Sequence, residues 1–190
     1  LGPLQHAGDY DFAEVTLTTL LYVFGGDPDR LYPETVDHIV NVLLIEEGGK
    51  ARVKVPGSYG MVIETENHHL MTEGSRYLKN QWLFSHGNTD SKYNNQANGL
   101  ETWLKGYLQQ MIDEGVYEFN SQPYIGYTIQ ALLNLEAFPD SSEITSRARY
   151  VLDIINYQYA LGSLELRRLA PFRRQTRHAE DTALNHDYNT

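Results

Sequence analysis

Apolar residues recur at helical spacing in six successive stretches of the chain, and this pattern restricts the fold more than any other feature. The clearest stretch begins near Leu100 and ends at Gly115, with its apolar side chains along one stripe. No convincing parallel strand lies between the stretches. The expected helices cover about residues 9–24, 32–44, 65–84 and 95–115, and the apolar positions of two further helices extend over 129–135 and 144–159. We therefore predict an all-α fold of three successive antiparallel helical hairpins, with a small β-like hairpin near 53–63.

The composition of the chain argues against several classes of function. The chain has 190 residues, no cysteine and a formal net charge of −10. The lack of cysteine excludes thiol catalysis and thiolate metal sites. The acidic balance argues against nucleic-acid binding, and no apolar run is long enough for a membrane helix, so we expect neither nucleic acid nor membrane insertion. Because the chain starts at Leu1 without an initiator Met and its end carries no helix stop signal, we expect residues 1–190 to be a single domain of a larger protein.

The densest group of chemically active side chains is Glu64-Thr65-Glu66-Asn67-His68-His69, where the third helix should begin. Helical geometry turns Glu66 and Asn67 toward the apolar stripe, His68 away from it and His69 to one side. The structural alternative for this group is capping, since Thr65 suits an N-cap and glutamates suit the positive end of a helix. Adjacent imidazoles neither cap well nor favour a helix start. We therefore predict a functional role for Asn67 together with at least one histidine.

If neighbouring helices are antiparallel, the connections between them alternate between two ends of the array. One end then carries mostly connectors. The other end collects Asn67, His68 and His69, then Glu118, Asn120 and Tyr124, then Arg167, Arg168, Arg173 and Arg174. Guanidinium groups match carboxylate and sulfate groups bidentately. Amide, imidazole, carboxylate, phenol and guanidinium groups in one place are what an anionic-sugar site requires, so we predict such a site at this end.

Each of these groups also has a structural alternative. The segment 118–121 can cap the fifth helix, with Asn120 or Ser121 as N-cap and Pro123 in the first turn. Tyr124 can be a core aromatic residue. The arginines can form a solvated face, although four of them within eight positions is unusual in an acidic chain.

Other kinds of site have weaker support. The group at Glu64–His69 contains metal-ligand types, but the H-E-x-x-H pattern is absent and adjacent histidines on a helix diverge. Neither a Gly-rich phosphate loop nor a G-x-S-x-G elbow occurs. We therefore predict no metal and no cofactor.

Three short motifs carry a resemblance to a known family. They are Thr65-Glu66-Asn67-His68, then Glu118-Phe119-Asn120-Ser121 with Tyr124, then Ala131-Leu132-Leu133-Asn134-Leu135. In this order they resemble extracellular bacterial relatives of the (α/α)-toroid polysaccharide lyases, of the heparinase and alginate-lyase kind, over roughly residues 9–162. The resemblance implies a partial (α/α) toroid, because a complete toroid has more hairpins than this chain. It also implies a secreted or periplasmic protein whose partner is an anionic polysaccharide or oligosaccharide.

The resemblance also implies roles for individual residues. Carried over by residue type, Asn67 would neutralise the uronate carboxylate, His68 or His69 would be the base, and Tyr124 would be the acid. The residues expected to bind substrate are Glu66, Glu118, Asn120, Arg167, Arg168, Arg173 and Arg174. The C5 proton of a uronate becomes removable only when the developing enolate charge is stabilised, and an imidazole can then accept it. The expected activity is cleavage of a uronate-containing polysaccharide by β-elimination.

Two other functions stay open. A glycoside hydrolase on the same scaffold would use Glu64, Glu66 or Glu118 as an acid/base pair. A non-catalytic helical module would instead hold a glycan or a protein partner on its polar rim, and a fold does not by itself choose between these functions.

Overall fold

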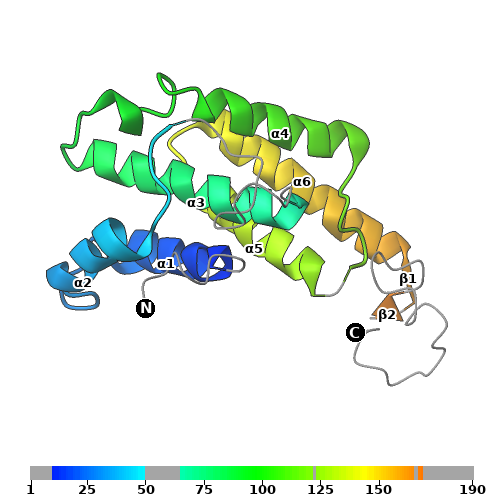
Figure 1. Cartoon of the computed structure of the whole chain (residues 1–190). Helices are drawn as coiled ribbons and strands as arrows, with labels where there is room; N and C mark the ends of the chain where they lie inside the picture. Colours follow the sequence, from blue (N-terminus) through cyan, green and yellow to red (C-terminus); the bar gives the residue numbers. More distant parts are fainter. Residues whose placement is uncertain (1–9, 50–64, 122, 165–166, 169–190) are drawn as a thin grey trace.

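The computed structural model describes residues 10–49, 65–121, 123–164 and 167–168. Its helices are α1 (Asp11–Phe24), α2 (Pro33–His38), α3 (Glu66–Ser85), α4 (Leu100–Glu114), α5 (Tyr124–Ala137) and α6 (Ser142–Leu161), with a π-helical segment η2 (Ile39–Leu43) and a 3-10 segment η3 (Ser91–Tyr93). Two-residue strands β1 (Ser163–Leu164) and β2 (Arg167–Arg168) pair antiparallel after α6. The all-α prediction is confirmed (Figure 1). The hairpin expected near 53–63 lies outside the described residues.

Glycine and proline set several helix ends close to the predicted positions. Gly25, Gly115 and Gly162 directly follow α1, α4 and α6, and Pro33 opens α2. The helix predicted for 32–44 is not one regular α-helix, because its second half, η2, is π-helical.

Two helices begin later than the sequence predicts. The fourth helix was expected from about residue 95, but Gly99 has a φ of 86° and α4 starts only at Leu100. Asn120 has a φ of 55°, in the left-handed region that asparagine tolerates better than most residues, and α5 starts at Tyr124 with Pro123 before it. Neither Asn120 nor Ser121 is the N-cap of α5.

Helices α1, α3 and α5 run in the same direction, and each of them packs against the other two (Figure 1). The His68 ring near the start of α3 contacts Asp11 at the start of α1, and the Tyr22 hydroxyl near the end of α1 donates to the Leu78 carbonyl of α3 at 2.8 Å. The Asn134 amide of α5 bonds the second half of α1 in the same sense.

Helices α4 and α6 run opposite to α1, α3 and α5 and parallel to each other (Figure 1). Lys105 in the first half of α4 pairs with Glu143 in the first turn of α6 at 2.8 Å. At the turn between α5 and α6, Arg149 pairs with Glu136, as an antiparallel hairpin requires. The starts of α1, α3 and α5 therefore share one end of the molecule, and the starts of α4 and α6 share the other, which agrees with the predicted alternation of connections.

Helix α3 occupies the centre and is enclosed around its whole circumference. Every residue from Glu66 to Asn80 is buried except His68. The prediction of a single buried stripe on this helix is therefore wrong. It fails because α1, α5 and α4 pack against α3 on different sides and the backbone of 44–48 crosses its remaining face.

The charged residues of α3 are buried against that crossing segment. The Arg76 guanidinium pairs with Glu46 and with Glu73, each at 3.2 Å, and the Lys79 ammonium donates to the Leu44 carbonyl. The Asn80 side chain accepts from the Gly48 N–H at 2.7 Å. These contacts satisfy polar groups that would otherwise be costly to bury, so this face of α3 stabilises the fold.

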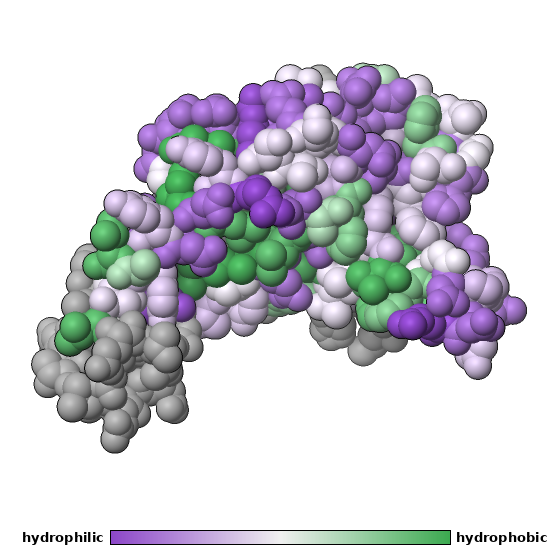
Figure 2. Space-filling view, turned by 180° about the vertical axis from the view of Figure 1, so that it is seen from behind, coloured by the Kyte–Doolittle hydropathy of each residue, from purple (hydrophilic) through white to green (hydrophobic). Residues whose placement is uncertain are grey.

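The apolar core lies among the packed helices. It is built mainly from α3, α4, α5 and α6, and a smaller cluster joins α1 to the 39–44 segment. The side of the molecule turned away from the viewer of Figure 1 carries a band of apolar side chains bordered by polar ones (Figure 2). Among the described helices, none is both long and apolar enough to cross a membrane.

Candidate functional site

Most of the predicted site residues that the structure describes lie at the end where α1, α3 and α5 begin. Glu66, Asn67, His68 and His69 form the first turn of α3, Glu118 and Asn120 lie in the connection from α4 to α5, Tyr124 is the first residue of α5, and Arg168 follows α6. Glu64, Arg173 and Arg174 lie outside the described residues, and Arg167 is described only by its place in β2.

His68 forms a close pair with a carboxylate of α1. Its Nδ1 lies 2.5 Å from Oδ2 of Asp11, and the side chains of His68 and Asp11 are 17% and 6% exposed. The Phe12 ring lies 5.4 Å from the imidazole centroid. A largely buried carboxylate on Nδ1 fixes the orientation of the imidazole and makes Nε2 its basic nitrogen.

Asp11 was not among the residues predicted from the sequence. The signal that could have found it is the alternation of helix directions, because this places the start of the first helix at the same end as the start of the third. The connections between the helices do not include the start of the first helix, so they did not point to Asp11.

Tyr124 lies on the same side of α3 as His68. Its ring packs edge-on against Tyr127 at 6.4 Å between centroids, and Tyr127 packs on Phe12 at 4.5 Å. The rings of Tyr127 and Phe12 thus lie between Tyr124 and His68, and the predicted pairing of a histidine with Tyr124 stays a prediction.

His69 points to the other side, between α3 and α4. Its ring lies 5.7 Å from Trp103 and 5.3 Å from Tyr107, and the residue is 9% exposed. Among the described residues its Nδ1 has no hydrogen-bond partner. Burial, and to a lesser degree His68, lower the pKa of His69, so this imidazole is neutral at pH 7.

A cavity of about 510 Å³ opens beside His69. Glu66, Tyr107, Glu114 and Tyr117 also line it, and its lining contains no lysine or arginine of the described chain. The two predicted histidines therefore face different surroundings. His68 lies with Asp11 and Tyr124, whereas His69 lines a cavity that carries carboxylates.

Glu66 ties the start of α3 to the connection between α4 and α5. Its carboxylate accepts from the backbone N–H of Tyr117 at 2.6 Å and from that of Glu118 at 3.4 Å. Burial raises the pKa of Glu66 to about 6, and the charge of Glu118 acts in the same direction. The backbone N–H groups and the Thr128 hydroxyl partly offset this rise. Glu66 thus combines a structural role with a pKa close to neutrality.

Asn67 and Glu118 have no exposed surface, and Asn120 is 6% exposed. The Asn67 Oδ1 accepts from the Thr65 hydroxyl at 2.7 Å, while its Nδ2 lacks a partner in the described part of the chain. The inward orientation predicted for Asn67 is confirmed. Direct contact between these side chains and a bound sugar would require them to become exposed, so their roles in substrate binding stay predictions.

Arg168 lies apart from the His68 group. Its guanidinium carbon is 5.1 Å from the Tyr159 ring centroid, and it lines a cavity of about 240 Å³ with Phe119 and Ile155. This cavity lies between α5 and α6, so Arg168 neighbours the predicted site without entering the His68 pair.

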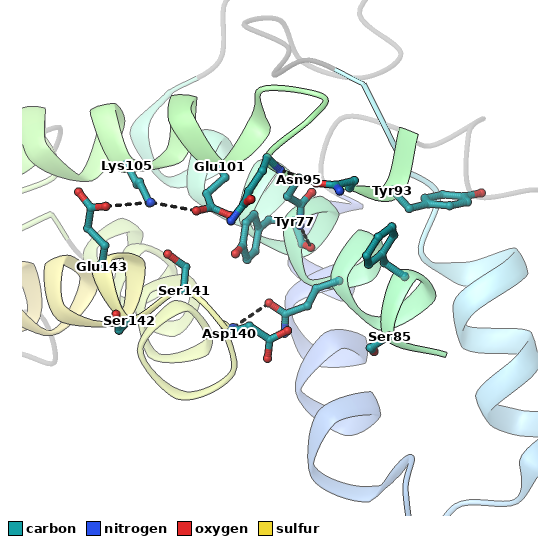
Figure 3. A pocket seen from close by; sticks show the side chains of 14 residues that line it. Tyr77, Ser85, Tyr93, Asn95, Glu101, Lys105, Asp140, Ser141, Ser142 and Glu143 are labelled. Atoms are coloured by element: carbon teal, nitrogen blue, oxygen red, sulfur yellow. Dashed lines mark hydrogen bonds and ion pairs between the residues drawn. The ribbon is translucent and has the colours of Figure 1, made fainter. Parts of the chain in front are cut away.

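The opposite end of the molecule was expected to hold mostly connectors. A second cavity of about 510 Å³ lies there, between the end of α3 and the starts of α4 and α6 (Figure 3). No described group of three histidine or carboxylate side chains is arranged to hold a metal ion at either end.

At the end where α1, α3 and α5 begin, the structure thus assembles an oriented imidazole, a phenol on the same side and a carboxyl with a pKa near 6. These groups are suited to proton transfer. Comparison of the chain with protein-family models, with curated proteins and with solved structures finds no significant match.

Proposed function

We propose that this chain is part of a carbohydrate-active (α/α) toroid and cleaves a uronate-containing polysaccharide by β-elimination, with His68 as the base. The observation that carries the proposal is the 2.5 Å contact between Nδ1 of His68 and Oδ2 of Asp11, on the side of α3 where Tyr124 lies. A carboxylate that orients a histidine in this way is a common support for a general base.

In the proposed reaction Nε2 of His68 takes the C5 proton of the uronate. The electron pair of the C5–H bond forms the C4=C5 double bond, and the bond from C4 to the glycosidic oxygen breaks. Tyr124 donates a proton to the departing oxygen. Asp11 holds the imidazole in position and stabilises its protonated form, as a buried carboxylate does beside a catalytic histidine.

The arrangement of the helices supports an anionic substrate at this end. Because α1, α3 and α5 are parallel, the positive ends of three helix dipoles lie side by side there. In a segment of an (α/α) toroid, parallel helices likewise have antiparallel helices packed against them. Ring closure would need further hairpins, so the toroid is part of the proposal.

The test is an absorbance assay for unsaturated uronate on alginate, glucuronan and glycosaminoglycans, with the wild-type chain and His68→Ala, Asp11→Asn and Tyr124→Phe. We expect the His68 and Tyr124 variants to lose roughly 10²- to 10⁴-fold in kcat, as removal of a general acid or base does. Asp11→Asn should lose activity because an amide carries no charge to stabilise the protonated imidazole, and its NH₂ group can hold His68 in the wrong tautomer. Circular dichroism would establish that each variant is folded.

His38→Ala is the matched control, since His38 lies exposed on α2 and takes no part in the site. His69→Gln distinguishes the two adjacent histidines, and we expect it to keep turnover. Loss of activity in His69→Gln with full activity in His68→Ala would overturn the assignment of the base. Absence of unsaturated product from every polysaccharide would overturn the lyase.

A hydrolase is the second candidate, because Glu66 has a pKa of about 6 and lines the cavity beside His69 together with Glu114. A carboxyl that is half protonated near neutral pH can act as a general acid, and a second carboxylate can act as base or nucleophile. The lack of a described cationic group in that lining suits a neutral sugar better than a uronate.

Measurement of reducing ends beside the absorbance assay separates the two reactions. Hydrolysis yields reducing ends without absorbance and should be lost in Glu66→Gln, whereas elimination yields both signals. Glu66→Gln keeps the oxygen that accepts from the Tyr117 N–H, so the fold should be preserved. Glycan binding that persists in the His68 and Glu66 variants, with no turnover in the wild type, would instead indicate a binding module.

A further inference from the structure

The cavity at the opposite end of the molecule is built from parts of the chain that the proposed reaction does not use. It has a volume of about 510 Å³ and lies between the second half of α3, the residues before α4 and the first turns of α4 and α6. Tyr77 of α3 lies in the middle of the lining, with Glu101 and Lys105 of α4 to one side and Asp140, just before α6, to the other (Figure 3).

One side of the cavity is closed by an ion-pair chain. The Lys105 ammonium lies 2.9 Å from Glu101 and 2.8 Å from Glu143, and the Arg147 guanidinium pairs with Glu143 from behind. These carboxylates are therefore neutralised within the protein. Lys105 fills the space between Glu101 and Glu143, so this pair of carboxylates is not arranged for a metal ion.

Asp140 lies across the cavity from this chain of ion pairs (Figure 3). Its backbone N–H donates to the Gln81 side chain at 2.9 Å. Its carboxylate has no ion pair or hydrogen bond with any described residue. The cavity thus presents one negative charge that the protein does not neutralise.

The Tyr77 hydroxyl is the second group without a partner. Tyr77 is 2% exposed, and within the described chain no hydrogen bond reaches its hydroxyl, although its backbone carbonyl accepts from Asn95 at 2.9 Å. Burial, followed by the charges of Glu101 and Asp140, raises the pKa of Tyr77, so the phenol is a neutral donor at physiological pH. Tyr77 lines the cavity, so its hydroxyl can donate to an oxygen of a ligand bound there.

We propose that this cavity binds a small ligand in which a protonated amine lies beside hydroxyl groups, as in an amino sugar. The ammonium group pairs with the Asp140 carboxylate, and a neighbouring hydroxyl oxygen accepts from the Tyr77 phenol. The rings of Tyr77 and Phe84 in the lining offer flat surfaces to the apolar face of such a ligand. Neither residue of the proposed catalytic pair takes part, so this proposal can fail or stand independently of the lyase.

The experiment is a calorimetric titration of the wild-type chain with glucosamine and with glucose at neutral pH. The two sugars differ in one ammonium group, which glucose replaces by a hydroxyl. We expect glucosamine to bind at least about tenfold more tightly, as loss of one charge-assisted contact predicts. Equal affinity for both sugars, or no heat with glucosamine, would overturn the proposal.

Variants test whether glucosamine binds in this cavity. Asp140→Asn should weaken glucosamine binding at least about tenfold, while Asp153→Asn, an exposed carboxylate on α6, changes the net charge equally and should leave affinity unchanged. Tyr77→Phe should weaken binding without lowering the melting temperature, because its hydroxyl bonds nothing in the described protein. Unchanged affinity in Asp140→Asn, or an equal loss in Asp153→Asn, would refute a specific site.

Discussion

Glu14 on α1 is a buried carboxyl whose protonation is linked to folding. It is 2% exposed, and its Oε1 accepts from the Ile45 N–H at 3.1 Å. Burial, and then the charge of Glu46, raise the pKa of Glu14 to about 8, against an ordinary value near 4.5. Between these two values the unfolded chain has lost the proton and the folded chain keeps it. Unfolding therefore releases a proton there, and this residue lowers stability as pH rises from about 4.5 to 8.

We expect Glu14→Gln to remove this loss of stability at higher pH. The variant keeps the oxygen that accepts from Ile45 but cannot ionise, so it should match the wild type near pH 5 and be more stable by about 1–3 kcal/mol near pH 8. Urea denaturation at the two pH values measures the difference. Glu34→Gln, on the exposed face of α2, is the control and should show no such divergence. If the difference in free energy of unfolding between the wild type and Glu14→Gln were the same at both pH values, the raised pKa of Glu14 would be contradicted.

At the scale of elements, one amide joins the parallel helices α1 and α5. The Asn134 Oδ1 accepts from the Thr19 hydroxyl at 2.9 Å, and its Nδ2 donates to the Val15 carbonyl at 3.0 Å. Asn134 is 6% exposed, so water cannot readily replace these bonds. The amide therefore fixes the axial position of α5 against α1, and with it the relative position of Tyr124 and Asp11.

Asn134→Ala should lower the free energy of unfolding by roughly 2–4 kcal/mol, because two buried hydrogen bonds are lost and a cavity is left. Gln130→Ala on the same helix is the matched control, since Gln130 is exposed and makes only a 3.3 Å contact with Thr16. Chemical denaturation of both variants measures the contrast. Equal losses would mean that the amide does not hold the two helices together.

Individual helices could be predicted from the sequence because the signals that start and end them are local. Gly115 ends α4 and Pro33 opens α2 through their own backbone geometry, whatever lies around them. The enclosure of α3 could not be predicted in this way. Arg76 and Lys79 suggest a solvated face, and they are buried only because a distant segment supplies Glu46 and the Leu44 carbonyl.

For the candidate site, the order of helix directions was the useful signal. It brought the starts of α3 and α5 to one end, where Glu66, His68 and Tyr124 are found. Which histidine lies on the side of α1 and α5 depends on how α3 is rotated among its neighbours, and that rotation is set by packing in three dimensions. The lone phenol of Tyr77 was hidden for the same reason, since its place in an apolar stripe says nothing about a cavity beside it.

On the scale of the whole molecule, the central position of α3 has a consequence for the order in which the protein opens. An amide exchanges its hydrogen with solvent only when its hydrogen bond breaks, and an enclosed helix cannot expose itself before its neighbours move away. We expect the backbone amides of residues 70–80 to exchange more slowly than those of α6, where only four residues are buried. Hydrogen exchange followed by mass spectrometry measures this, and faster exchange in α3 than in α6 would contradict it.

Because α3 is enclosed, the surroundings of His68 and of Tyr77 should be lost at the same time, when the protein unfolds. Both residues belong to α3, so the two ends of the molecule should persist together for as long as the globule does and disappear together when it unfolds. Microsecond motions of a surface loop would not change the relative positions of His68 and Tyr77. A ligand at either end would therefore bind a preformed site. Its dissociation rate would depend on its own contacts with the protein and not on opening of α3.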